Sequence, residues 1–317
     1  MTKRISYSIA LALGVFLLAD CGSNSSSSSL VGSPVQPLRV ATDHSASRLY
    51  VTNFINNTIT VYDAKGEEET TVFGWEGLTS PTGIWTDGRH FWVTNYGASG
   101  PEAVNFYNKN GKGPRFHNRP RRWWGVNHPL GITQVAYTFY ITDNGDDRVT
   151  AYSSVGKEQM LSGSWSGLDS PNGIAYDPRN GFLYVANEGN STVTAYDQNG
   201  NEQSLPGSWS GLYTPQGIAY DPTNRFLYVT NANSTVTAYD QNGKKKSLSG
   251  SFPGLNGPRG IAYDPYNGFI YVANYGNSTI TAYDQNGKGK SLSGSFPGLD
   301  GPYGIAIRCD QDLFGCH

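Results

Sequence analysis

The chain has 317 residues, of which 37% are hydrophobic, only 15% are charged and 39 are glycine. This composition fits a folded, β-rich protein and excludes an intrinsically disordered chain. The 23 basic and 25 acidic side chains nearly cancel, which argues against steering toward a nucleic acid or an anionic membrane surface.

The N-terminal residues have the pattern of an export signal. Lys3 and Arg4 precede an apolar run over residues 9–19, which is too short for a transmembrane helix but suits the core of a signal peptide. We therefore expect residues 1–20 to direct export and to be removed.

The sequence Leu-Ala-Asp-Cys that ends this run is similar to a bacterial lipoprotein box. Asp20 departs from it, because the residue before the cysteine is usually small and uncharged. The Ser-rich stretch that follows is typical of a flexible tether. We expect lipidation at Cys21 and a lipid-anchored tether over residues 21–36; the alternative is ordinary secretion with Cys21 lost or left as a free thiol.

From residue 37 onward the chain repeats itself. Units start at Pro37, Pro81, Pro129, Pro171, Pro215, Pro258 and Pro302, at intervals of 44, 48, 42, 44, 43 and 44 residues. A period in the low forties accommodates four short strands and their turns, which is the length of a propeller blade. The chain therefore holds six complete units and the start of a seventh.

Residues 171–214 are the clearest unit. They predict strands over residues 173–177, 182–187 and 192–197, with a weaker fourth strand over 204–209. The second strand, FLYVAN, is apolar on both faces, as expected for a sheet packed between two neighbours. A glycine in the first strand suits a crowded innermost position.

The repeated elements P-x-G-I-A-x-D, L-Y-V-A-N and T-V-T-A-Y-D-x-x-G resemble those of the NHL-repeat family. The string LYVTN at residues 49–53 and 227–231 is the one for which the YVTN family of propellers is named. The resemblance covers roughly residues 37–307 and implies an all-β, six-bladed β-propeller of four-stranded antiparallel blades. It leaves the function open, because these families include RNA binders, lyases, lactonase-like enzymes and protein-binding scaffolds.

We expect the propeller to span residues 37–301 and residues 302–317 to form a closing strand and a tail. The closing strand either pairs across the seam of the ring or packs beneath it. Cys309 and Cys316 are the two cysteines left after Cys21, and six residues separate them in a short tail. In an oxidising compartment they most simply form one disulfide.

The second and third units depart most from the repeat. No acidic residue lies between Glu102 and Asp143, and several arginines are interleaved with aromatic side chains there. Such a patch can hold a polyanion, a sugar acid or an acidic protein loop. The candidate binding residues in it are Arg115, Arg119, Arg121, Arg122 and Trp124. The alternative is a solvated outer strand in which Trp123, aligned with the tryptophans of other units, packs in the interior.

A second candidate surface is the mouth of the central channel. The variable residue of P-x-G and the residue after the second strand change from unit to unit while their neighbours are constant, which is typical of a repeat scaffold that presents a ligand surface; drift at exposed positions gives the same pattern. The candidate residues there are Tyr96, Glu188, Arg259, Tyr275 and Tyr303.

No motif indicates catalysis or a bound metal. Amides at one repeated position, with a carboxylate in the third unit, could bind Ca²⁺ as in lactonase-like propellers, but a turn residue bonding its own backbone explains them better. The positions are Asn53, Asn95, Asp143, Asn187, Asn231 and Asn274. His117 and His128 lie near the divergent arginines and leave a lyase or hydrolase site open. We expect no cofactor and no metal.

The sequence thus favours a binding or scaffolding module of the cell envelope that presents its loops to a protein or glycan partner. The alternative is a lactonase- or lyase-like enzyme with a site at the channel mouth. We expect an exported monomer, held to the membrane by its lipid anchor only or else secreted, without a nucleic acid partner.

Overall fold

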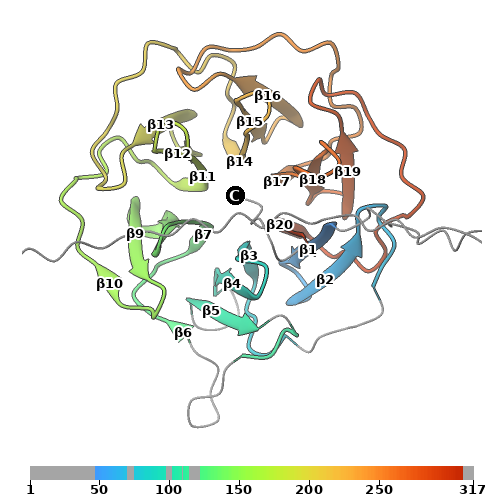
Figure 1. Cartoon of the computed structure of the whole chain (residues 1–317), viewed down its shortest axis with the longest axis horizontal. Helices are drawn as coiled ribbons and strands as arrows, with labels where there is room; N and C mark the ends of the chain where they lie inside the picture. Colours follow the sequence, from blue (N-terminus) through green and yellow to red (C-terminus); the bar gives the residue numbers. More distant parts are fainter. Residues whose placement is uncertain (1–46, 70–74, 98–101, 109, 114–121, 310–317) are drawn as a thin grey trace, which may run out of the picture. The chain divides into compact units, whose positions relative to one another are not determined.

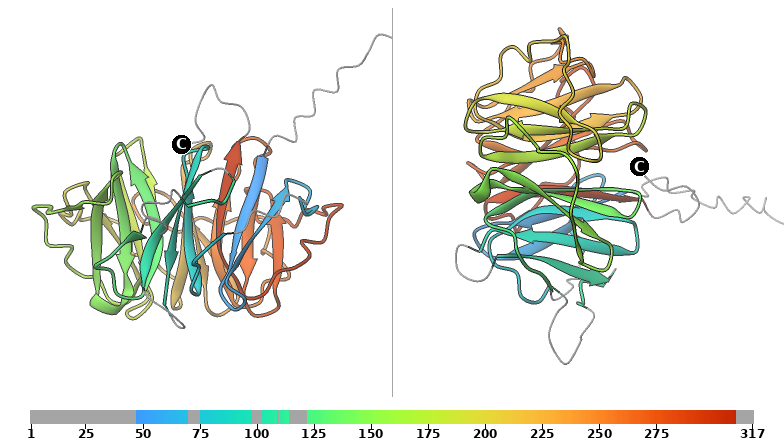
Figure 2. Two further views of the ribbon diagram at one scale, coloured as in Figure 1. Left: turned by 90° about the horizontal axis from the view of Figure 1, so that it is seen from below. Right: turned by 90° about the vertical axis from the view of Figure 1, so that its left-hand side faces the viewer.

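Six antiparallel sheets lie around a common centre in the described part of the chain (Figure 1). The computed structural model describes residues 47–69, 75–97, 102–108, 110–113 and 122–309. Seen from the side, the strands run roughly along the central axis (Figure 2). We number the sheets one to six in chain order, by their second strands.

The innermost strand of each sheet, except in sheet one, begins at the proline of its own repeat unit. For sheets one to six these strands are β20 (Pro302–Cys309), β3 (Pro81–Thr86), β7 (Pro129–Val135), β11 (Pro171–Asp177), β14 (Pro215–Asp221) and β17 (Pro258–Tyr263). They contact one another in a closed circle, with β20 lying between β17 and β3.

The second strands carry most of the core. They are β1 (Ser47–Asn53), β4 (His90–Asn95), β8 (Thr138–Asp143), β12 (Phe182–Asn187), β15 (Phe226–Asn231) and β18 (Ile270–Asn274). In β12 the residues from Leu183 to Asn187 are all buried, so both faces of this strand are covered, as the sequence predicts.

The third strands follow after short turns. They are β2 (Thr58–Asp63), β5 (Ala103–Asn108), β9 (Arg148–Ser153), β13 (Thr192–Tyr196), β16 (Thr235–Tyr239) and β19 (Thr279–Tyr283). Only two sheets have a fourth strand in the described residues, with β6 (Arg122–Trp123) in sheet two and β10 (Glu158–Gln159) in sheet three. A short 3-10 helix, η1 (Asn144–Asp146), follows β8.

In the other four sheets the fourth segment makes a single isolated bridge to the third strand within the described residues, as Glu202 does with Tyr196, and not the expected fourth strand. In sheet four the main-chain nitrogen of Gln203 donates to Ala195, and the chain then leaves the sheet. Gly207 and Trp209 instead donate to the Asn242 and Gly243 carbonyls in the turn of the next sheet. Ser, Pro and Gly dominate residues 204–208, and these residues pair poorly as an edge strand.

The ring is closed by strand pairing across the seam, which decides between the two alternatives for the closing strand. β20 pairs antiparallel with β1, with Leu49 opposite Ile307 and Tyr50 opposite Ala306. Main-chain bonds from the end of the sixth unit to the first sheet reinforce this closure, since Phe296 donates to Gly66.

Glycines allow the innermost strands to approach closely. A Cβ atom on Gly173 would lie 2.7 Å from the main-chain oxygen of Gln216 in the next sheet, and one on Gly304 would press on Thr82. The first-strand glycine therefore occupies the crowded position that the sequence predicts.

No helix in the described ranges is both long and apolar enough to cross a bilayer.

Candidate ligand-binding mouth

The variable residues at the start of the innermost strands gather at one end of the central channel. The pairing of Pro171 with Asn187 places the start of β11 beside the end of β12, and the main-chain nitrogen of Glu188 donates to Ser170 at 3.1 Å. The two kinds of variable position thus share one face, as expected. We call this end of the channel the narrow mouth, because its central pocket has a volume of only about 90 Å³.

Two sets of side chains make up the narrow mouth. The first set follows the proline of each innermost strand and comprises Thr82, Leu130, Asn172, Gln216, Arg259 and Tyr303. The second set follows each second strand and comprises Phe54, Tyr96, Asn144, Glu188, Ala232 and Tyr275.

Aromatic side chains from sheets one, two and six cluster on one side of the narrow mouth. The ring centroid of Phe54 lies 5.7 Å from that of Tyr96, 6.2 Å from that of Tyr275 and 5.9 Å from that of Tyr303. These four rings are half-buried, and Ile55 beside them is 54% exposed. The cluster therefore offers an apolar surface to a ligand.

A chain of polar side chains continues from sheet four to sheet six. Asn172 donates to Glu188 Oε2 at 3.1 Å and to Gln216 Oε1 at 2.8 Å, and Arg259 donates to the same oxygen of Gln216. Asn172 and Gln216 are almost fully buried, so these bonds fix the orientation of both amides.

Arg259 joins the polar chain to the aromatic cluster. Its guanidinium carbon lies 5.6 Å from the ring centroids of both Tyr275 and Tyr303. No carboxylate of the described residues forms an ion pair with it. Within the described residues its guanidinium contacts ring faces and an amide, which leaves it able to receive an anionic group.

Tyr303 lies in the aromatic cluster beside the guanidinium of Arg259. Burial raises its pKa, and the charge of Glu188 acts in the same direction, while Arg259 opposes the shift. The Tyr303 phenol therefore stays protonated at neutral pH and can donate a hydrogen bond to a ligand.

His128 belongs to the narrow mouth rather than to the arginine patch beside which the sequence places it. Its imidazole stacks on Tyr96 with centroids 4.4 Å apart, and Nε2 lies 3.2 Å from Glu102 Oε1. A histidine paired with a carboxylate therefore lies beside the aromatic cluster. Its closeness to the arginines in the sequence did not predict this position.

The described members of the arginine patch, Arg122 and Trp124, lie elsewhere, on the circumference of the ring (Figure 1). Arg122 is on the outermost strand β6, where its Nη2 donates to Gly77 at 2.8 Å and its guanidinium lies 5.9 Å from the ring of Trp124. Trp124 is 57% exposed, whereas Trp123 is buried in the core, as its alignment with the other tryptophans predicts. Three residues of the patch lie outside the described part of the chain, namely Arg115, Arg119 and Arg121.

The amides at the end of the second strands accept hydrogen bonds from the main chain. Asn95 Oδ1 accepts the main-chain N–H of Thr79 at 2.8 Å, and Asn274 Oδ1 accepts that of Asn256 at 3.1 Å. Each amide thus ties the end of a second strand to the loop that enters the innermost strand of the same sheet. Among the described residues no three His, Cys, Asp or Glu side chains are grouped as metal ligands.

The carboxylate at this repeated position has a charged partner. Asp143 is fully buried, and its Oδ2 accepts Arg148 Nε at 2.9 Å and Thr150 Oγ1 at 3.0 Å. Burial raises the pKa of Asp143, while the hydrogen bonds from Asn127, Arg148 and Thr150 act against that rise.

Several predicted features fall outside the described residues. They are the export signal, Cys21 and the tether, the first strand of the first unit, His117, and Cys316 with the side chain of Cys309.

Six antiparallel sheets around a channel, with variable loops at one mouth, define a β-propeller. Two family models match parts of the chain: "NHL repeat" over residues 168–196 and "Lactonase, 7-bladed beta-propeller" over residues 201–296. The chain is thus a β-propeller with matches to the NHL and lactonase types. No curated protein matches it significantly.

Solved structures support the fold alone. A chain of a nidogen/laminin complex aligns with a TM-score of 0.63 and 18% identity, covering 84% of this chain and 99% of that one. A functionally unknown protein from Desulfotomaculum acetoxidans DSM 771 aligns with a TM-score of 0.56 and 16% identity, covering 84% and 87%. A candidate 6-phosphogluconolactonase from Bacteroides fragilis NCTC 9343 aligns with a TM-score of 0.60 and 13% identity, covering 84% and 99%.

Proposed function

We propose that this protein is a binding module of the cell envelope whose narrow mouth docks a protein partner. The observation that carries the proposal is the contact of Arg259 with the rings of Tyr275 and Tyr303, which in turn pack on Phe54 beside Tyr96. Tyrosine and arginine dominate the binding energy of protein interfaces, and they act best when clustered near the centre of a contact.

The chemistry of the narrow mouth favours an acidic loop on the partner. A carboxylate that reaches Arg259 gains a charge-assisted hydrogen bond from a guanidinium that no described carboxylate neutralises. The rings around it exclude water from that contact, and Glu188 at the far side disfavours an acidic group there. A protein loop offers this combination of one acidic and several apolar groups more readily than a neutral glycan does.

The test compares variants at the two candidate surfaces. The purified protein captures partners from envelope extract, and each partner identified by mass spectrometry is purified and its binding remeasured. The double variant Arg259→Ala with Tyr275→Ala should lose about tenfold or more in affinity. The matched variant Arg122→Ala with Trp124→Ala, on the circumference, should bind like the parent. The reverse result would move the site to the arginine patch.

We propose six blades for the propeller. The support is the closed circle of six innermost strands in the described residues and the six complete repeat units of the sequence. The seven-bladed family model matches only residues 201–296, about two units, and so does not bear on the number of blades. A crystal structure with a seventh sheet in the ring would contradict this.

We also propose export and a lipid anchor. The support is the apolar run over residues 9–19, the Cys21 context and the Ser-rich tether. The processed protein, with its lipid on Cys21, should partition from membranes into detergent, and Cys21→Ala should release it as a soluble form. A protein that is equally soluble with and without Cys21 would be secreted instead. Mass spectrometry without reduction tests the expected Cys309–Cys316 disulfide.

A second candidate function is a lactonase-like enzyme at the same mouth. The observation in its favour is the lactonase model match, which includes Gln216 and Arg259, together with the His128–Glu102 pair nearby. Hydrolysis of a panel of sugar lactones that is lost in His128→Ala, but retained in Arg122→Ala, would support it.

A further inference from the structure

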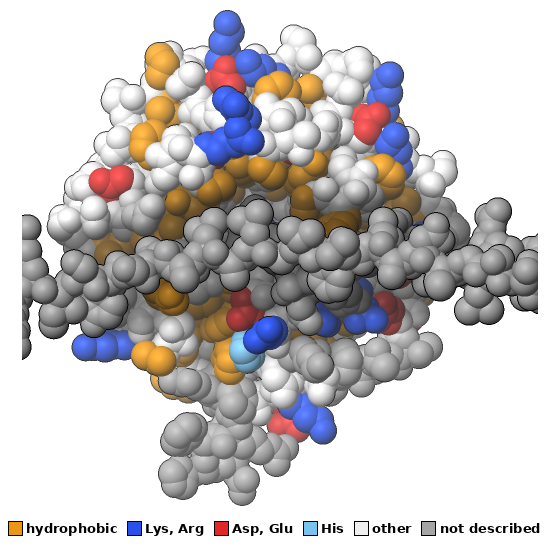
Figure 3. All heavy atoms as spheres, viewed as in Figure 1, with side chains coloured by type: hydrophobic (Ala, Val, Ile, Leu, Met, Phe, Trp, Pro, Cys, Tyr) orange, Lys and Arg blue, Asp and Glu red, His pale blue; other side chains and the backbone are white. Residues whose placement is uncertain are grey.

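The end of the channel opposite the narrow mouth holds a large cavity. Its volume of about 790 Å³ falls in the range of roughly 300–1,000 Å³ that is usual for small-molecule sites. We call it the wide cavity; it is bounded by the later residues of the innermost strands and by the turns that follow them. Figure 3 shows hydrophobic side chains on this face on either side of its centre.

A layer of isoleucines separates the wide cavity from the narrow mouth. One isoleucine follows the P-x-G of each innermost strand, and five of these line both spaces: Ile84, Ile132, Ile174, Ile261 and Ile305. They are buried and form the floor of the wide cavity. A ligand in it is therefore independent of the partner proposed for the narrow mouth.

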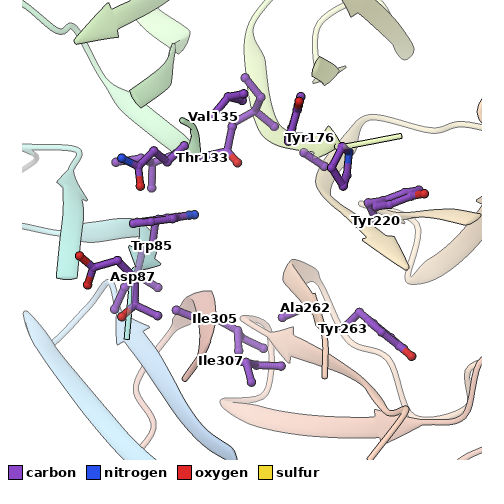
Figure 4. A pocket seen from close by; sticks show the side chains of 18 of the residues that line it. Trp85, Asp87, Thr133, Val135, Tyr176, Tyr220, Ala262, Tyr263, Ile305 and Ile307 are labelled. Carbon is purple, nitrogen blue, oxygen red and sulfur yellow. The ribbon is translucent and has the colours of Figure 1, made fainter. Parts of the chain in front are cut away.

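The walls of the wide cavity are aromatic. Trp85 lies on one side, and Tyr176 and Tyr220 come from the sheets across the channel (Figure 4). In five innermost strands the position of Trp85 holds alanine or threonine, so a single indole projects into a ring of small residues. Trp85 also packs on Trp92 and Phe139 with centroids 5.4 Å away, which fixes the orientation of its ring.

Two tyrosine hydroxyls at the wide cavity are already engaged. The Tyr263 hydroxyl bonds with Thr223 at 2.8 Å and accepts from Gln285 at 3.2 Å, and the Tyr176 hydroxyl accepts from Gln198 at 3.4 Å. The Tyr220 hydroxyl is buried and has no hydrogen-bond partner among the described residues. Figure 4 shows the hydroxyl ends of Tyr220 and Tyr263 pointing away from the centre. The cavity therefore receives mostly ring surfaces from these residues.

The wide cavity carries little net charge. Asp87 is the ionisable carboxylate among its lining residues, and it is already engaged. Its Oδ1 accepts the main-chain N–H groups of Arg89 and His90, and its Oδ2 lies 3.1 Å from His90 Nδ1. A charged ligand would lose its hydration without gaining a free partner. Thr133, Gln134 and Gln198 offer a few neutral polar groups instead.

We propose that the wide cavity is a second binding site, which takes an uncharged, planar aromatic molecule. The molecule stacks between the indole of Trp85 and the tyrosine rings, rests on the isoleucine layer and meets the neutral polar groups at its edge. Aromatic stacking supplies affinity beyond the apolar area that is buried, and the lining, as far as the structure describes it, offers no free charge to an ion.

The test uses N-phenyl-1-naphthylamine, an uncharged aromatic probe whose fluorescence rises in apolar surroundings, with the purified full chain. We expect saturable binding at one site. Trp85→Ala should weaken it about tenfold or more, because the stacking surface is lost. Arg259→Ala and Trp124→Ala, which alter the narrow mouth and the circumference, should leave the affinity unchanged.

A second variant covers the case in which Trp85→Ala fails to fold. Ala262 occupies the position of Trp85 in another sheet and lines the same cavity, so Ala262→Trp fills the space without deleting a native contact. It should abolish probe binding while circular dichroism and the thermal midpoint stay close to those of the parent. The proposal is overturned if the parent shows no saturable binding, or if folded Ala262→Trp binds the probe as tightly as the parent.

Discussion

The hydroxyl of Thr52 donates a hydrogen bond of 2.6 Å to the main-chain oxygen of Thr82 and accepts one of 2.7 Å from the main-chain nitrogen of Gly304. Thr52 lies in β1, Thr82 in the second sheet and Gly304 in the closing strand. One side chain thus links both ends of the described chain to the neighbouring sheet, and the valine-threonine-asparagine end of β1 contributes directly to closure of the ring.

Replacing Thr52 with valine should therefore lower the free energy of unfolding by about 1–3 kcal/mol. The substitution keeps the shape of the side chain but leaves two buried backbone groups without this partner. Urea denaturation at neutral pH measures the change. Thr235→Val, at an exposed threonine whose hydroxyl bonds Asn233, is the control and should change stability by less than about 0.5 kcal/mol.

Gly173 lies at the same end of the channel, and the close approach of the next innermost strand makes it sensitive to substitution. Gly173→Ala should cost about 1–3 kcal/mol, because the new methyl group would lie 2.7 Å from the Gln216 carbonyl and the two sheets would have to separate. Thermal unfolding checks this. Ser204→Ala adds no volume at an exposed site, and an equal loss in both variants would mean that the strands are not packed this closely.

The sequence predicted the features that depend on a position repeated in every unit. The first-strand glycine, the covered second strand and the inward Trp123 each recur at a fixed offset, and a repeat that packs on itself must bury the same positions in each unit. The gathering of variable residues at the narrow mouth followed from the same geometry.

Features that depend on contacts between units could not be read in this way. The fourth segment of a unit leaves its own sheet because its best partner is the turn of the next sheet, as with Trp209 and Gly243. The placement of His128 beside Tyr96 also depends on neighbouring sheets. The wide cavity was missed altogether, although one signal existed: Trp85 stands where the other units have alanine or threonine.

The third unit offers a test of how charge is accommodated in the core. Arg148→Ala should lower the free energy of unfolding by roughly 2–4 kcal/mol, since it leaves the buried carboxylate of Asp143 with two neutral donors only. The double variant Asp143→Asn with Arg148→Thr restores the Asn and Thr found in four other units, and it should recover most of the loss. Equal stability of Arg148→Ala and the double variant in urea would show that the unpaired carboxylate is not the cause of the loss.

Buried carboxylates at the wide end of the channel predict an unusual dependence of stability on pH. Asp264 is fully buried; its Oδ1 accepts Ser47 Oγ and the main-chain N–H of Tyr266, both at 2.9 Å, while its Oδ2 lacks a donor among the described residues. Burial raises the pKa of Asp264 above its ordinary value of 3.8. Asp284, in an exposed turn, has its pKa lowered, because main-chain donors such as Lys288 and Asn286 outweigh its desolvation.

Because the pKa values of Asp264 and Asp284 shift in opposite directions, their contributions to stability should change in opposite directions with pH. The stability that protonated Asp264 contributes is present below the unfolded pKa and is lost as the pH rises through the higher folded pKa. Asp264→Asn should remove that loss, so its stability relative to the parent should increase as the pH rises above the ordinary aspartate pKa of 3.8. The stability from Asp284 is present above its unfolded pKa and is lost as the pH falls through the lower folded pKa. Asp284→Asn should therefore be less stable than the parent at neutral pH, by an amount that shrinks on acidification. Urea denaturation of the three proteins from acidic to neutral pH measures both trends; parallel curves for the two variants would contradict the assignment of buried and exposed carboxylates.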